Sequence, residues 1–120
     1  MTHKEIAISF LKLAGTGQVD EAFESFISSN FIHHNQYFQG TREALMAAMK
    51  EAHVHSPNKS IEVKFCYEDG ASVITHTHVK QELMEIAVVH IFRFEGDHIA
   101  ELWDMGQPIE KESPNEYGLF

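Results

Sequence analysis

The chain has 120 residues, of which 43% are hydrophobic and 22% charged, and this composition is typical of a single soluble domain, which we expect to span residues 1–120. Eighteen acidic against nine basic residues give a formal charge of −9, so binding to nucleic acids or to anionic membranes is disfavoured. The single cysteine, Cys66, excludes an internal disulfide and a cysteine-based zinc cluster. No apolar run could cross a bilayer and the N-terminus does not resemble a signal peptide, so we expect a cytoplasmic location.

The first half of the chain is predicted to be helical. The segment Thr2-His3-Lys4-Glu5 has the spacing of a capping box, and the helix that it opens should stop at Gly15. A second stripe of apolar residues at helical spacing runs from Val19 to Ile27. Thr41 can cap a third helix, which the segment Ser56-Pro57-Asn58 should end.

The second half of the chain changes to the alternating pattern of strands. Turn residues at 68–70 and 95–98 separate segments rich in β-branched and aromatic residues, which we predict as strands near 61–65, 71–79, 86–94 and 99–107. Helices followed by an antiparallel meander of about four strands indicate an α+β fold, in which the helices cover one face of a curved sheet.

One face of this sheet carries the polar residues of greatest interest. A hairpin register that keeps parity lays His90 opposite or diagonal to Asp104 and brings Arg93 near Glu101, a pair that we interpret as structural. If His76 lies on the same face, two histidines and an aspartate stand among apolar residues, and burying them unpaired would be costly. A candidate pocket is one interpretation, and a solvated sheet face is the other; the residues concerned are His76, His78, His90, Phe92, Leu102 and Asp104.

The opposite parity set has the composition of a protein interface. Its residues are largely apolar with one tryptophan and one arginine, which predicts a homodimer through this face. The set comprises Thr75, Thr77, Val79, Val89, Ile91, Arg93, Glu101, Trp103 and Met105. The tail 115–120 ends in large apolar side chains, so we expect it to pack near the pocket mouth, where it could close over Asp104, or at the dimer seam.

Three segments resemble the SnoaL-like polyketide cyclase family of the nuclear transport factor 2-like (NTF2-like) superfamily. They are Phe31–Asn35, Gly40–Leu45 and Ile91–Pro108. The resemblance implies a cone-shaped α+β fold of the NTF2-like or cystatin-like type, in which a curved antiparallel sheet wraps around the N-terminal helices and encloses an apolar pocket. It also implies cofactor-free acid/base chemistry, such as intramolecular aldol condensation or isomerisation, on a small hydrophobic or carbonyl-containing molecule.

The resemblance makes Asp104 the acid/base residue, with His34, Asn35 and His76 as its neighbours in the pocket. A base removes a proton next to a carbonyl, and a hydrogen-bond donor stabilises the enolate oxygen. We therefore predict Asp104, His34 and His76 as catalytic residues. The predicted ligand-binding residues are Asn35, His78, His90, Phe92 and Leu102. Relatives often carry histidine in place of Leu102 and an acidic residue in place of His90, which puts the inherited reaction in question.

Other functions remain open from the sequence. One is a non-catalytic module that shelters a small hydrophobic ligand. Another is a metal site, because imidazoles and a carboxylate suit Zn²⁺, Ni²⁺ or Fe²⁺, although we expect neither metal nor cofactor. Its ligands would be His34, His76, His78, His90 and Asp104. A partial cupin motif around His76 and His78 lacks its last glycine and its second half. We treat His3, His53, His55 and His98 as surface residues.

Overall fold

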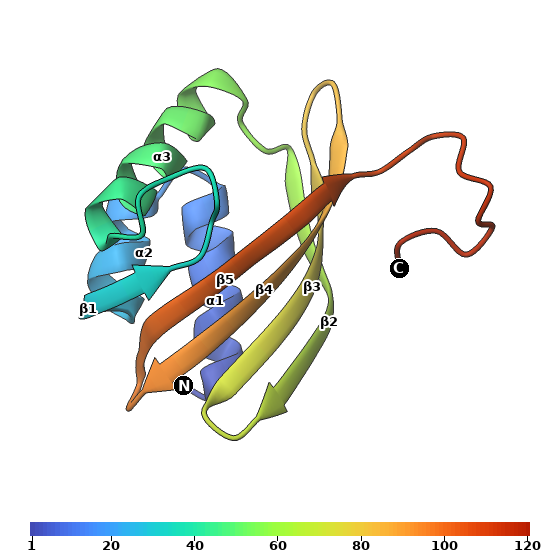
Figure 1. Ribbon diagram of the computed structural model, residues 1–120. Helices are drawn as coiled ribbons and strands as arrows, with labels where there is room; N and C mark the ends of the chain where they lie inside the picture. Colours follow the sequence, from blue (N-terminus) through green and yellow to red (C-terminus); the bar gives the residue numbers. More distant parts are fainter.

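The computed structural model describes residues 1–120 as three helices packed against one face of a curved five-stranded sheet (Figure 1). The strand order is β1-β5-β4-β3-β2, so β1 and β2 form free edges and the sheet does not close into a barrel. The elements are α1 (His3–Gly15), α2 (Val19–Phe26), β1 (Ile27–His33), α3 (Arg42–His55), β2 (Ser60–Asp69), β3 (Ser72–Lys80), β4 (Glu85–Glu95) and β5 (His98–Pro108).

The helices begin where the sequence predicts. The amide of Glu5 donates to the hydroxyl of Thr2 at 3.1 Å and the amide of Thr2 donates to the carboxylate of Glu5 at 2.8 Å, which completes the capping box of α1. The Thr41 hydroxyl accepts from the amide of Ala44 and caps α3. The longest helix has 14 residues, and none is long and apolar enough to cross a membrane.

The strand β1 is the one element that the sequence did not predict. The helix α2 ends at Phe26, and Ile27–His33 pairs in parallel with β5, Ile32 lying beside Glu101. The polar run at 28–30 hides the alternation of this strand, which explains why its pattern was missed. The α+β fold is confirmed, but the sheet is mixed because β1 is parallel to its neighbour.

The core fills the space between the helices and the concave side of the sheet, which bends around α1 (Figure 1). Phe10 of α1 packs against Phe23 of α2 and Phe92 of β4, with ring centroids 5.6 and 6.2 Å apart. All three side chains are completely buried. We call the side of the sheet that faces the helices the inner face and the opposite side the outer face.

The register of the strands decides which residues share a face. His90 lies opposite Asp104 on β5 and opposite Thr75 on β3, so these three residues belong to the inner face. His76 lies opposite Val89 and therefore belongs to the outer face. The β4–β5 pairing thus joins even-numbered with even-numbered residues, whereas the β3–β4 pairing joins even-numbered with odd-numbered ones.

The expectation that His76 and His78 share a face with His90 is therefore wrong. Both histidines point to the outer face, and Thr75, Thr77 and Val79, which we expected in the dimer interface, point inwards. The cause is the turn between β3 and β4, because a register shift of one residue moves every side chain of a strand to the other face.

The C-terminal tail turns back towards the outer face after β5 (Figure 1). The ring of Phe120 stacks on His76 and His78, with centroids 4.7 and 5.0 Å apart. The predicted packing of the tail is confirmed for this last residue, whereas Tyr117 stays 82% exposed. The expectation that the tail closes over Asp104 is wrong, because the sheet lies between them.

Candidate acid/base site

Two cross-strand neighbours form the centre of the candidate site. Nε2 of His90 lies 3.5 Å from Oδ1 of Asp104, and the side chain of Asp104 is 21% exposed. Asn35 donates from Nδ2 to the other carboxylate oxygen of Asp104 at 2.8 Å. The parallel pairing of β1 with β5 brings Asn35 there, since the amide of His34 donates to the carbonyl of Leu102.

The imidazole of His90 is buried and neutral. Burial lowers its pKa, and the negative charge of Asp104 only partly offsets this effect. A carboxylate facing Nε2 favours the tautomer that carries its proton on Nε2, which leaves Nδ1 as a hydrogen-bond acceptor. Nδ1 is buried and has no hydrogen-bond partner in the protein. The ring therefore has Nε2 facing Asp104 and Nδ1 without a partner in the protein.

Two hollows meet at this pair. The first, which we call the inner cavity, lies between α1, α3 and the sheet and has a volume of about 180 Å³. His90 and Thr77 line it together with the mainly apolar side chains Leu11, Ala14, Met49, Ile61 and Val79. The second, which we call the open cleft, is lined by Asn35, Asp104, Met84, Ile86 and Val88. The pair thus stands between a hollow with mainly apolar walls on the helix side and a more polar cleft beside Asn35.

Two threonines of β3 lie beside the pair with unused hydroxyl groups. Thr75, opposite His90, and Thr77, two residues further along, are both completely buried. Neither Oγ1 atom has a hydrogen-bond partner. Buried polar atoms without partners are rare in folded proteins. The inner face therefore carries three unused polar atoms close together, one on each of Thr75, Thr77 and His90.

The structure brings only part of the predicted site together. Asn35, His90 and Asp104 meet at the boundary of the cavity and the cleft. Phe92 and Leu102 are completely buried in the core, and they form the next cross-strand pair on the inner face beside His90 and Asp104. His34 lines the open cleft with Asn35 and Asp104, although its ring stacks on Trp103 and contacts Glu101. His76 and His78 have their side chains on the outer face.

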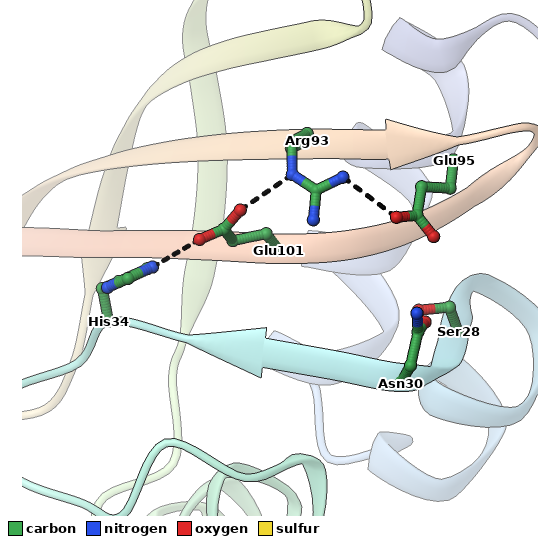
Figure 2. Close-up of polar contacts among 6 residues, drawn as sticks. All are labelled: Ser28, Asn30, His34, Arg93, Glu95 and Glu101. Carbon is green, nitrogen blue, oxygen red and sulfur yellow. Dashed lines mark hydrogen bonds and ion pairs between the residues drawn. The ribbon is translucent and has the colours of Figure 1, made fainter.

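The outer face carries a connected polar network (Figure 2). Arg93 donates from Nε to Oε1 of Glu101 at 2.7 Å, which confirms the predicted cross-strand pair, and from Nη1 to Oε1 of Glu95 at 3.2 Å. Nε2 of His34 lies 2.6 Å from Oε2 of Glu101, and its ring stacks on Trp103. Hydrogen bonds from His34 and then Arg93 lower the pKa of Glu101. Hydrogen bonds to Glu101 and then to Glu95 raise the pKa of Arg93.

The residues considered as alternative metal ligands do not gather around one point. The sheet separates His76 and His78 from His90 and Asp104, and His78 binds Glu85 at 2.6 Å instead. No group of three or more His, Cys, Asp or Glu side chains lies close enough to hold one ion. The shared metal site considered from the sequence therefore does not form from these five residues.

The helical wall of the inner cavity was missed by sequence reasoning. His53 of α3 is exposed, as interpreted from the sequence, and it also lines the cavity with Asn58 and Gln81. A usable signal was present, because His53 stands four residues after Met49 on the apolar stripe of the helix. His3 is half-buried, since its ring stacks on Phe94 with centroids 4.1 Å apart.

Comparison with solved structures identifies the fold. An NTF2-like protein of unknown function from Burkholderia xenovorans superposes with a TM-score of 0.74 at 16% identity, over 93% of this chain and 88% of that chain. A SnoaL-like polyketide cyclase from Agrobacterium tumefaciens gives 0.73 at 14% identity, over 89% and 92%. An epoxide hydrolase of the LEH-like type from M. tuberculosis gives 0.71 at 14% identity, over 88% and 82%.

The chain therefore has the NTF2-like fold, and the resemblance inferred from its sequence is confirmed at the level of the fold. No protein-family model and no curated protein matches the sequence. Since this fold supports several unrelated activities, the function has to be argued from the site itself.

Proposed function

We propose that this protein is a cofactor-free acid/base enzyme that moves a proton at the carbon next to a carbonyl group of a small hydrophobic molecule. The reaction would be an intramolecular aldol condensation or an isomerisation. The observation that carries the proposal is the pairing of His90 with Asp104 where an apolar cavity meets an open cleft.

This arrangement supplies the base that such a reaction requires. A proton next to a carbonyl leaves only when a base stands close by and a donor stabilises the enolate oxygen. The buried His90 is neutral and can accept a proton, and Asp104 stabilises the imidazolium that forms. Asn35 holds the carboxylate in place from the cleft side. An apolar surrounding strengthens each of these electrostatic interactions.

Two of the structural neighbours are consistent with this class of function. One is described as a SnoaL-like polyketide cyclase and another as an LEH-like epoxide hydrolase, so the fold accommodates chemistry on small organic molecules. The proposal also includes a homodimer through the outer face. It further includes a cytoplasmic location, with which a single free cysteine is consistent, because thiols stay reduced there.

Proton exchange at carbon tests the proposal without knowledge of the natural substrate. Small ketones, β-diketones and β-keto esters are incubated with the protein in D₂O, and loss of the α-proton signal is followed by NMR. We expect faster exchange with the wild-type protein than with buffer, and loss of that acceleration in Asp104→Asn. The matched control is Asp69→Asn, an exposed aspartate at the end of β2, which should keep the full rate. Equal rates in Asp104→Asn and wild type would refute the proposal.

A second function, binding without catalysis, is favoured by the apolar walls of the inner cavity. Under this alternative, compounds of the same panel would shift the NMR signals of residues around the cavity, and no α-proton would exchange faster than in buffer. The exchange assay and the binding assay on one sample therefore separate the two functions.

A further inference from the structure

We propose that the inner cavity takes a compact cyclic or branched ketone, whose oxygen accepts a hydrogen bond from Thr77 and whose α-carbon faces Nδ1 of His90. This inference rests on the proposed acid/base function and adds the class of substrate, the atom that takes the proton and the residue that holds the oxygen.

The first argument is the set of unused polar atoms. Oγ1 of Thr77 and Nδ1 of His90 are buried without partners, and both residues line the inner cavity. They stand on adjacent strands in diagonal positions, since Thr77 lies opposite Val88 and His90 lies two residues further along β4. Diagonal neighbours of this kind are close enough for one small ligand to reach both. A bound carbonyl compound would supply the partners that the protein lacks.

The second argument is the different surroundings of the two ring nitrogens of His90. Nε2 faces Asp104, so Nδ1 is the nitrogen that can accept a proton. Asp104 lines the open cleft and does not line the inner cavity. For a ligand in the cavity, His90 is therefore the base, and Asp104 is a positioning residue that also stabilises the charged ring.

The proposed step balances without a further reactant. The α-carbon–hydrogen bond breaks, the proton moves to Nδ1 of His90, and the electron pair shifts onto the carbonyl oxygen to give an enolate. The hydroxyl of Thr77 donates to that oxygen while the imidazolium keeps its second proton on Nε2, opposite Asp104. Return of the proton to the same carbon gives exchange, and return to a conjugated carbon gives isomerisation.

The third argument is the size and lining of the cavity. Its volume of about 180 Å³ slightly exceeds that of an apolar cavity of about 150 Å³ that admits benzene. Leu11, Met49 and Ile61 provide apolar contact for the ring of such a ligand. His53 and Asn58 line the same cavity and could accept a second polar group.

The binding test compares two probes with equal numbers of heavy atoms, cyclohexanone and toluene, by NMR titration of the full chain. We expect Thr77→Val, which keeps the shape of the side chain, to weaken cyclohexanone binding at least about fivefold and to leave toluene binding unchanged. Thr77→Ser should restore cyclohexanone binding. Failure of cyclohexanone to bind, or equal weakening of both probes in Thr77→Val, would overturn the assignment of Thr77.

The location test uses one blocking variant for each hollow. Ala52→Phe fills the mouth of the inner cavity from α3, and Met84→Trp fills the open cleft without entering the cavity. We expect Ala52→Phe to abolish cyclohexanone binding and Met84→Trp to preserve it. The reverse result would place the ligand in the cleft and overturn the inference.

The catalytic test measures the exchange of the α-protons of cyclohexanone in D₂O. His90→Gln should remove the enzymatic rate, and Thr77→Val should lower it about 100-fold, the usual effect of losing one oxyanion donor. Exchange that is lost in His90→Gln but stays fast in Thr77→Val would overturn the inference and leave the proposed function standing. Cyclohexanone binding that depends on Thr77 without any exchange would instead refute the proposed function and leave the pocket assignment standing.

Discussion

Two polar side-chain pairs between the same two strands, β4 and β5, differ in their surroundings and in their hydrogen bonding. On the outer face, Arg93 and Glu101 lie 2.7 Å apart, and both oxygens of Glu101 have partners because His34 holds the second one. On the inner face, His90 and Asp104 lie 3.5 Å apart, and Nδ1 of His90 has no partner. The outer pair is partly solvated, whereas the inner pair borders an apolar cavity.

The difference shows how environment separates structural from functional polar groups. A partly solvated pair whose polar atoms all have hydrogen-bond partners connects the two strands and has no free polar atom to bind a ligand. A buried group with an unused nitrogen is unfavourable for folding and becomes useful when a ligand completes it. Both pairs were visible in the sequence as cross-strand neighbours, and only their surroundings distinguish them.

The largest expected effect comes from changing the matching carboxylate of each pair. Asp104→Asn should lower the α-proton exchange rate by about 10² to 10⁴-fold, because the imidazolium of His90 loses its counter-charge. Glu101→Gln should leave this rate within about threefold of wild type and lower the melting temperature, because it breaks the outer network. Exchange measured by NMR and melting measured by circular dichroism check both variants. A similar loss of activity in the two variants would show that the faces do not differ in the way described.

The next effect concerns the stability that each face contributes. Phe92 on the inner face is completely buried, so Phe92→Ala should lower the free energy of unfolding by about 3–5 kcal/mol. Its chain neighbour Ile91 points to the outer face and is only half-buried, so Ile91→Ala should cost clearly less, about 1 kcal/mol. Urea unfolding measures both values. Equal losses would contradict the assignment of the core to the inner face.

The third effect tests the outer face as a dimer interface. Its exposed side is largely apolar and comprises Ile74, His76, Val89, Ile91, Trp103 and Met105, a set corrected by the observed register. Met105→Glu should convert a dimer into a monomer at micromolar concentration, because it buries an unpaired charge. Val54→Glu, at an exposed site on α3, is the control and should stay dimeric. Light scattering that finds only monomer in the wild type would refute the interface.

The fourth effect is the pH dependence of stability that His90 causes. Since the pKa of His90 is lowered in the folded protein, the unfolded chain binds the proton first as the pH falls below about 6.5. This residue therefore makes stability decrease on acidification, starting near that pH. His90→Gln should flatten the fall in melting temperature between pH 7 and pH 5.5 relative to wild type. The lowered pKa of Glu101 acts in the same direction at more acidic pH, so Glu101→Gln should lower the melting temperature by a constant amount above about pH 4.5 and change the slope of the curve only below it.

The smallest effect concerns the C-terminal tail. Deleting residues 119–120 removes the stacking of Phe120 on His76 and His78, so we expect a fall in melting temperature of a few degrees at most. Hydrogen exchange should increase at the amides of β3 and stay unchanged around Asp104. Increased exchange at Asp104 would indicate that the tail reaches the inner site after all.

Local structure and fold class could be predicted from the order of the residues alone. Helix caps at Thr2 and Thr41 and the alternation of the strands are read from residues close together in the chain, so they were predicted correctly. The cross-strand pairs of the last hairpin were also predicted, because a short connection limits the possible registers to a few. The alternation of β1 was hidden by its polar run, and only its pairing with β5 makes it a strand.

Only the tertiary structure decided which residues share a face and which polar groups are satisfied. Period-two alternation divides each strand into two sets, and the register between strands then chooses which sets lie together. That choice moved His76 and His78 to the outer face and brought Thr75 and Thr77 next to His90. The inner cavity depends in addition on α3, whose His53 and Met49 reach the sheet from a distant part of the chain. Long-range packing of this kind leaves no periodic trace in the sequence, which is why the buried threonines and the helical wall came from the structure alone.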